Sequence, residues 1–120
     1  MEEILSVLFH SRTQAHIFHL QSPSYAQHKA LQKYYEGIVD FIDGIVESYM
    51  GKYGILTDIT MPVNSTNLTN DRDILSYFEK LIKYVQLIRK KLPTDTYLEN
   101  QYDEVETLIN STIYKLKFLN

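Results

Sequence analysis

Four stretches of helical pattern, separated by a short, a long and a short connection, constrain the fold of this chain most strongly. Apolar residues recur at gaps of three and four within residues 3–20, 23–50, 71–92 and 96–119. This spacing places them on one face of a helix. No strand pattern or internal repeat competes with it, so the sequence predicts an all-α protein with four helices.

Capping residues set the expected helix ends. Ser22 followed by Pro23 predicts the N-cap and first turn of the second helix, which Gly51 or Gly54 should end. Capping boxes predict the starts of the last two helices, formed by Asn70 with Asp73 and by Thr96 with Glu99.

The connection between the second and third helices is the longest break in the helical pattern. Residues 53–69 are rich in Thr, Asn, Ser, Pro and Gly. Extended, they could reach about 55 Å, more than the roughly 40 Å length of the second helix. Two tight hairpins joined by one long crossover are typical of ferritin-like bundles. We therefore expect a ferritin-like four-helix bundle with one crossover between helices 2 and 3, forming one domain over residues 1–120.

Composition excludes several classes of function. The chain has 120 residues, a net charge of −3 and no cysteine. The acidic balance gives no reason to expect nucleic-acid binding, and histidine and carboxylate are the only good metal ligands left. No apolar run approaches the roughly 18 residues that a membrane span needs. We expect a cytoplasmic protein, in the host cytoplasm if a virus encodes it.

His16, His28, Asp43 and Glu47 form the candidate metal site, with gaps of twelve, fifteen and four residues. In one continuous helix His28 and Asp43 lie about 22 Å apart along the axis, so one chain cannot close this site. Two antiparallel copies crossing near Gly37 would bring His28 of one chain beside the carboxylates of the other. The mixed N/O donor set suits ferrous iron first, with zinc or manganese as alternatives.

Three segments around these residues, 14–16, 24–28 and 40–47, resemble the metal-site region of the Dps mini-ferritins. The resemblance implies a ferroxidase centre at a twofold dimer interface formed by helices 1 and 2, which oxidises Fe(II) with peroxide or oxygen. It implies that His16, His28 and Asp43 are ligands and that Glu47 is the bridging or the strongest carboxylate ligand. His19 and Asp40 are candidates for additional ligands.

The chain departs from the Dps pattern at several points. Ile17 stands where the family usually has tryptophan, Gln32 occupies a position that is often acidic, and the lysine-bearing tail is missing. A higher homo-oligomer is compatible with the resemblance, but a dodecameric shell, iron storage and DNA binding do not carry over. Such a short, divergent member would suit a virus or a small genome.

Two alternatives stay open from the sequence. His16 and His19, three residues apart on one helix, could bind zinc together with His10 or His28. The chain could also be a non-enzymatic structural or interaction module that keeps the bundle and the dimer, with a vestigial or purely structural metal site. Iron oxidation distinguishes this module from the ferroxidase, whereas dimer formation does not.

Overall fold

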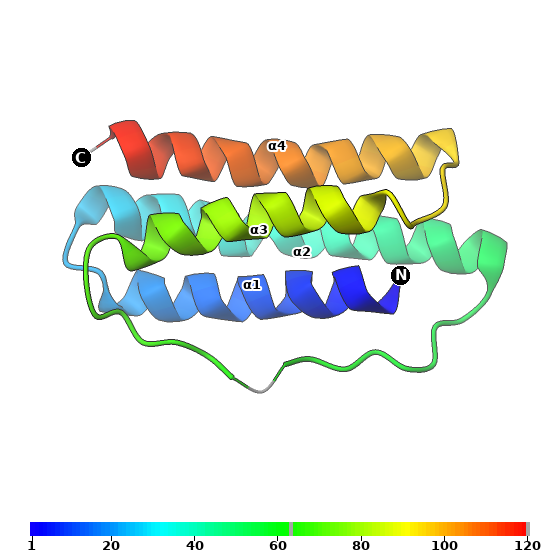
Figure 1. The fold of residues 1–120 in the computed structure, drawn as a ribbon, viewed down its shortest axis with the longest axis horizontal. Helices are drawn as coiled ribbons and strands as arrows, with labels where there is room; N and C mark the ends of the chain where they lie inside the picture. The colour runs from blue at the N-terminus through cyan, green and yellow to red at the C-terminus, as the bar shows by residue number, and fades with distance from the viewer. Residues whose placement is uncertain (63, 120) are drawn as a thin grey trace.

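A computed structural model describes residues 1–62 and 64–119, which form four helices and no strand. The helices are α1 (Glu2–Gln21), α2 (Tyr25–Tyr53), α3 (Asp73–Arg89) and α4 (Thr96–Phe118). They lie side by side as a bundle (Figure 1), which confirms the all-α class and the four-helix bundle expected from the sequence. Within the described residues, none of the helices is both long and apolar enough to cross a membrane.

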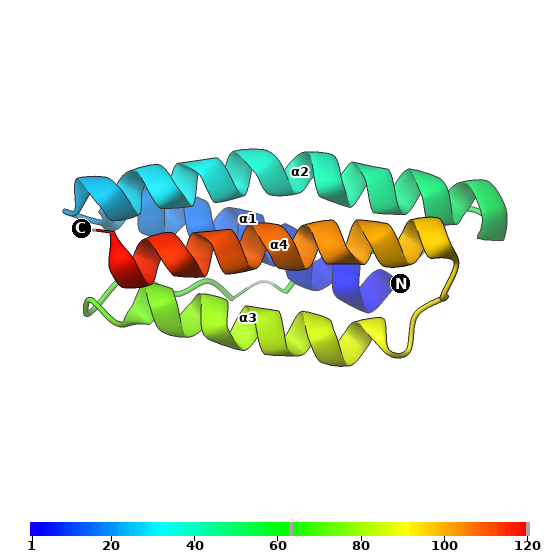
Figure 2. The same cartoon turned by 90° about the horizontal axis from the view of Figure 1, so that it is seen from above.

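The four helices form two hairpins. Contacts join α1 to α2, α3 to α4, α2 to α4 and α1 to α3. Figure 1 shows α2 and α3 running in the same direction, with the described parts of their connection returning along the bundle beside α1. Seen from above in Figure 2, α4 lies between α2 and α3. The start of α2 and the end of α4 therefore lie at the same end of the molecule.

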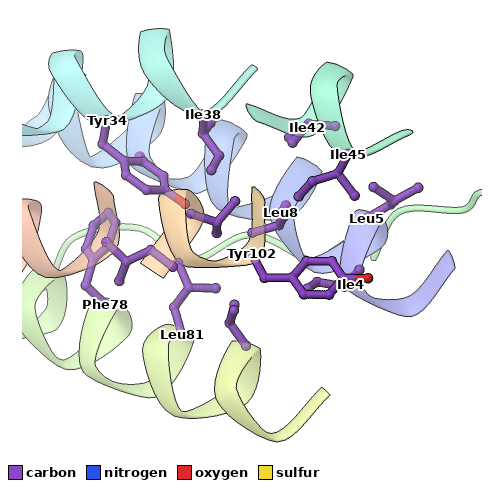
Figure 3. Packing of buried hydrophobic residues seen from close by; sticks show 14 of the residues in the cluster. Ile4, Leu5, Leu8, Tyr34, Ile38, Ile42, Ile45, Phe78, Leu81 and Tyr102 are labelled. Carbon is purple, nitrogen blue, oxygen red and sulfur yellow. The ribbon is translucent and has the colours of Figure 1, made fainter. Parts of the chain in front are cut away.

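Apolar stripes from all four helices meet in one core. Figure 3 shows Tyr34 of α2, Phe78 of α3 and Tyr102 of α4 among the aliphatic side chains of α1 and α2. The rings of Tyr34 and Phe78 pack edge to face, with centroids 4.8 Å apart. Burying one such side chain contributes roughly 1.5–3 kcal/mol. Most residues of these stripes are buried; Phe41, Tyr49 and Leu116 are only partly buried against the core, and Leu119 is exposed.

The cap predicted for α2 is wrong by two residues. The N-cap is Ser24, whose side-chain oxygen accepts a hydrogen bond from the Gln27 backbone N–H at 3.3 Å. Ser22 instead donates to Oε1 of Gln27 at 2.6 Å, so that Pro23 lies in the turn between α1 and α2. The other end of α2 is as predicted, because Gly54 is its C-cap with a φ of 98°.

The remaining helix starts also depend on side chains outside the helix. At α3 the N-cap is Arg72 and not the predicted Asn70, whose Oδ1 accepts from the Arg72 N–H at 3.0 Å. Only half of the predicted box forms: the Asp73 carboxylate accepts the backbone N–H of Asn70 at 3.1 Å, and also that of Thr69 at 2.9 Å. At α4 the N-cap is Asp95 and not Thr96, so the predicted box with Glu99 is wrong. The Asp95 carboxylate makes no cap bond because it is bound to Lys52 and to the Tyr53 hydroxyl.

Gly37 and Gly44 of α2 lie against α4 of the same chain. A Cβ at Gly37 would be 3.5 Å from the Leu108 side chain, and one at Gly44 would be 3.5 Å from Nε2 of Gln101. The missing side chain at Gly37 is therefore explained by packing within one chain, and the crossing of two chains near Gly37 stays a prediction.

Polar side chains of α1 bind the backbone of the connection between α2 and α3. Gln14, which is fully buried, donates to the Thr66 carbonyl at 2.7 Å and accepts from the Thr66 N–H at 2.8 Å. His10 donates from Nε2 to the Asn64 carbonyl at 2.6 Å. These bonds satisfy backbone N–H and C=O groups of the connection, which have no partner within a helix. They hold residues 64–66 against α1.

Candidate functional site

A pair of stacked histidines joins the end of α1 to the start of α2. The rings of His19 and His28 lie 3.6 Å apart between centroids and 20° from parallel. Nδ1 of His19 bonds to the His28 carbonyl at 2.8 Å, and Nδ1 of His28 bonds to the His19 carbonyl at 2.9 Å. His19 lies two residues before the last residue of α1, where carbonyls lack an intrahelical donor. The His28 side chain supplies that donor.

These bonds decide which nitrogen of each ring could bind a metal. A carbonyl oxygen only accepts, so Nδ1 of His19 and Nδ1 of His28 must both carry hydrogen. In the neutral ring Nε2 then keeps its lone pair, which is the form that ligates metals. A backbone carbonyl on the other nitrogen is the usual way in which a ligating imidazole is oriented. His28 is therefore held in a ligand-competent form.

His16 lies one turn before this pair and is exposed. Its ring stacks on Tyr35 of α2, with centroids 4.2 Å apart and planes 11° from parallel. The His16 and His19 centroids are 5.9 Å apart. His16, His19 and His28 thus form a row across the α1–α2 hairpin. The ring beside His28 is that of His19 and not that of the ligand candidate His16, because the turn between α1 and α2 is centred after Ser22.

The candidate carboxylates lie farther along α2. Asp43, Glu47 and the additional candidate Asp40 are all exposed. Among the described residues, no hydrogen bond or ion pair engages these three carboxylates. Asp43 is fifteen residues from His28, which is about 22 Å along a straight helix. One chain therefore holds the histidines and the carboxylates as two separate groups.

No set of three or more His, Asp or Glu side chains in the described part of the chain is arranged to hold a metal ion. The zinc alternative with His10 is not formed either, since both His10 ring nitrogens have other partners. They bond to the Asn64 carbonyl and, at 3.1 Å, to the Tyr77 hydroxyl.

Sequence reasoning missed the position of Tyr35 against His16, and it treated His19 as a candidate ligand and not as the partner of His28. The spacing held a signal for His19, since residues three apart share a helix face. It held none for Tyr35, because that contact depends on how the two helices meet. Tyr34, its neighbour in sequence, lies in the core, and its hydroxyl is 2.7 Å from the Ser11 hydroxyl.

Comparison with known proteins gives a family but no activity. No curated protein and no solved structure matches the chain significantly. One family model matches residues 19–116, a range that includes His28, Asp43 and Glu47 and begins after His16. The chain therefore belongs to DUF5856, a family of unknown function.

Proposed function

We propose that the chain binds Fe(II) at two equivalent sites shared between the subunits of a twofold dimer, and oxidises it there. The observation that carries the proposal is the placement of the ligand-type side chains on the α1–α2 hairpin. His16, Asp43 and Glu47 are exposed, and His28 is half-buried with Nδ1 bound to a carbonyl. One subunit would supply the histidines and its partner the carboxylates.

The length of α2 suits this arrangement. When two antiparallel copies of a helix are related by a twofold axis, the numbers of the residues that face each other add up to a constant. If His28 of one chain faces residues 43–47 of the other, the axis passes near residue 36. That position is close to the middle of the 29-residue helix α2. Two such helices would each pair one histidine end with one carboxylate region, which gives two sites per dimer.

The order of the helices supports the same proposal. The parallel course of α2 and α3, together with the connection that lies along α1, is what a ferritin-like crossover requires (Figure 1). Bundles of that type build iron sites from side chains on neighbouring helices. We propose that this chain is a ferritin-like bundle whose metal site lies between subunits.

The donor set fits iron as substrate. Imidazole nitrogen with two carboxylates suits Fe(II), and zinc or manganese would compete for the same ligands. Asp43 and Glu47 lie one turn apart on α2, where two negative charges without a cation repel by a few tenths of a kcal/mol. Each Fe(II) gives up one electron. Peroxide accepts two electrons and, with two protons, leaves as two waters.

Mixing two inactive variants tests whether the site is shared. His16→Ala/His28→Ala removes the histidine half, and Asp43→Asn/Glu47→Gln removes the carboxylate half. Each variant alone should neither bind Fe(II) saturably under anaerobic conditions nor oxidise it after peroxide is added. Random reassociation of equal amounts makes half of the dimers mixed, each with one intact site. About a quarter of the wild-type sites should return.

Exposed residues on α3 and α4 provide the matched control. Glu79→Gln/Glu104→Gln removes two exposed carboxylates that belong to neither α1 nor α2, and it should leave Fe(II) binding unchanged. Loss of activity in the mixture as well as in both parents would overturn the shared site. Fe(II) binding that is the same in wild type and in both double variants would overturn the proposed function as a whole.

A further inference from the structure

A cavity of about 450 Å³ lies between the first turns of α2 and the last turns of α4, away from the histidine row. Its walls include the ammonium-bearing side chains of Lys29, Lys33 and Lys115, with Ala26 and Ala30 at the base of the α2 side. Figures 1 and 2 both place the start of α2 beside the end of α4 at one end of the bundle. The cavity therefore joins two segments that are far apart in sequence.

The charges around this cavity are unbalanced. Among the described residues that line it, three are lysines and one is a carboxylate, Glu36, which accepts a hydrogen bond from Nε2 of Gln32 at 3.0 Å. Of the ion pairs within residues 1–62 and 64–119, none includes Lys29, Lys33 or Lys115. Burial lowers the pKa of Lys115, and the neighbouring positive charge of Lys33 lowers it further. The two ammonium groups thus repel each other across the cavity.

We infer that this cavity binds a small soluble anion bearing phosphate groups, held by Lys33 and Lys115 with Lys29 at its edge. A compact ammonium is a good partner for phosphate oxygens, and an anion between two such groups turns their repulsion into attraction. Ala26 lies in the first turn of α2, a turn that contains no acidic residue and whose unpaired N–H groups also favour negative charge.

The shape favours a small soluble anion over a nucleic acid. Lysines of two helices, Lys33 of α2 and Lys115 of α4, line the same cavity, and the whole chain carries a net charge of −3. A protein that binds the phosphate backbone of a nucleic acid over many nucleotides needs an extended basic surface. Pyrophosphate, with two phosphate groups, is the probe that can span Lys33 and Lys115 together.

Calorimetric titration of the iron-free protein with pyrophosphate tests the inference. The reference titration uses sodium chloride at the same ionic strength, which screens charge without filling the site. Pyrophosphate should bind with one site per chain. Lys33→Gln/Lys115→Gln should weaken this binding about tenfold or more, equivalent to about 1.4 kcal/mol.

Lys83→Gln/Lys90→Gln is the matched control, because it removes the same charge from exposed positions outside the cavity. It should leave the Kd within about twofold of wild type. Equal weakening in both double variants would show a general charge effect and overturn the site, as would pyrophosphate binding no better than chloride. The single variant Lys33→Gln gives a second measurement. In the absence of anion it should raise the pKa of Lys115, which NMR of the Lys115 ammonium group measures. An unchanged pKa would show that Lys33 and Lys115 do not lie close together.

Discussion

His19 and His28 each donate a hydrogen bond from Nδ1 to the other's backbone carbonyl, at 2.8 Å and 2.9 Å, while their rings stack at 3.6 Å. This reciprocal pair joins the last turn of α1 to the first turn of α2. It orients the imidazole on which the proposed iron site depends, and it stabilises the hairpin whether or not a metal binds.

Removing either member of the pair should destabilise the bundle. His28→Ala leaves the His19 carbonyl without its donor, and His19→Ala empties a buried ring position, so each should cost about 2 kcal/mol in the free energy of unfolding. The double variant should cost less than the sum by more than about 0.5 kcal/mol, because both changes break the same contacts. Urea unfolding measures all three, with His16→Ala as an exposed control. Strict additivity would show that the two rings do not act together.

Ser11 and Tyr34 should show an asymmetric response. Ser11 donates to the Leu8 carbonyl at 2.7 Å, so the Tyr34 hydroxyl is the donor in their 2.7 Å bond. Tyr34→Phe leaves Ser11 with a partner and should cost about 1 kcal/mol, whereas Ser11→Ala strands a fully buried hydroxyl and should cost about 1–3 kcal/mol.

The double variant Ser11→Ala/Tyr34→Phe distinguishes this explanation from simple loss of packing. With both hydroxyls gone no donor is stranded, so adding Tyr34→Phe to Ser11→Ala should recover part of the lost stability. Thermal or urea unfolding gives the comparison. A double variant less stable than Ser11→Ala would show that Tyr34 is not stranded in the single variant.

The helices could be predicted because apolar residues spaced three and four apart lie on one face of a helix, and that face is buried in the core. Residues such as Ile74, Phe78 and Leu81 are in the core, as their period requires. The helix starts at Ser24 and Asp95 could not be fixed in the same way. Before α2 and before α4, several residues that can act as N-caps follow one another in the sequence. Contacts with distant residues decide which of them is the N-cap; Asp95, for example, is bound to Lys52.

For the candidate site, the sequence predicted how far apart the histidines and carboxylates lie but not which ring lies beside His28. Spacing along α2 correctly implied that His28 and Asp43 are too far apart to meet within one chain. The pairing of His28 with His19 depends on where the turn between the helices is centred, and an error of two residues in the cap changes which histidine lies opposite. The joint role of His16, His28, Asp43 and Glu47 stays a prediction, because it requires a second chain.

Asp95 should make stability depend on acid. The Lys52 ammonium, then the Tyr53 hydroxyl at 2.6 Å, lower the pKa of Asp95 from 3.8 to about 2. Because the folded pKa lies below the unfolded one, the stabilisation is complete above pH 3.8 and is lost as pH falls toward about 2. Asp95→Asn should therefore be less stable than wild type near neutral pH and equally stable at the acid end.

Urea unfolding of wild type and Asp95→Asn across that range measures the difference, with Asp58→Asn, an exposed residue of the connection, as the control. The Asp58 variant should follow wild type at every pH. A difference between wild type and Asp95→Asn that does not change with pH would mean that the ion pair contributes nothing and that the substitution acts by another route.

Gly51 and Gly54, three residues apart at the end of α2, should respond to alanine with opposite signs. Gly51 is helical and an added Cβ would meet nothing within 4 Å, so Gly51→Ala should stabilise the protein by about 0.5–1 kcal/mol through lower backbone entropy of the unfolded chain. Gly54 has a φ of 98°, which side chains rarely adopt, so Gly54→Ala should cost about 1 kcal/mol or more. Thermal unfolding of both variants measures the two signs, and each variant serves as the control for the other. Stabilisation by both would show that α2 can end without the left-handed conformation at Gly54.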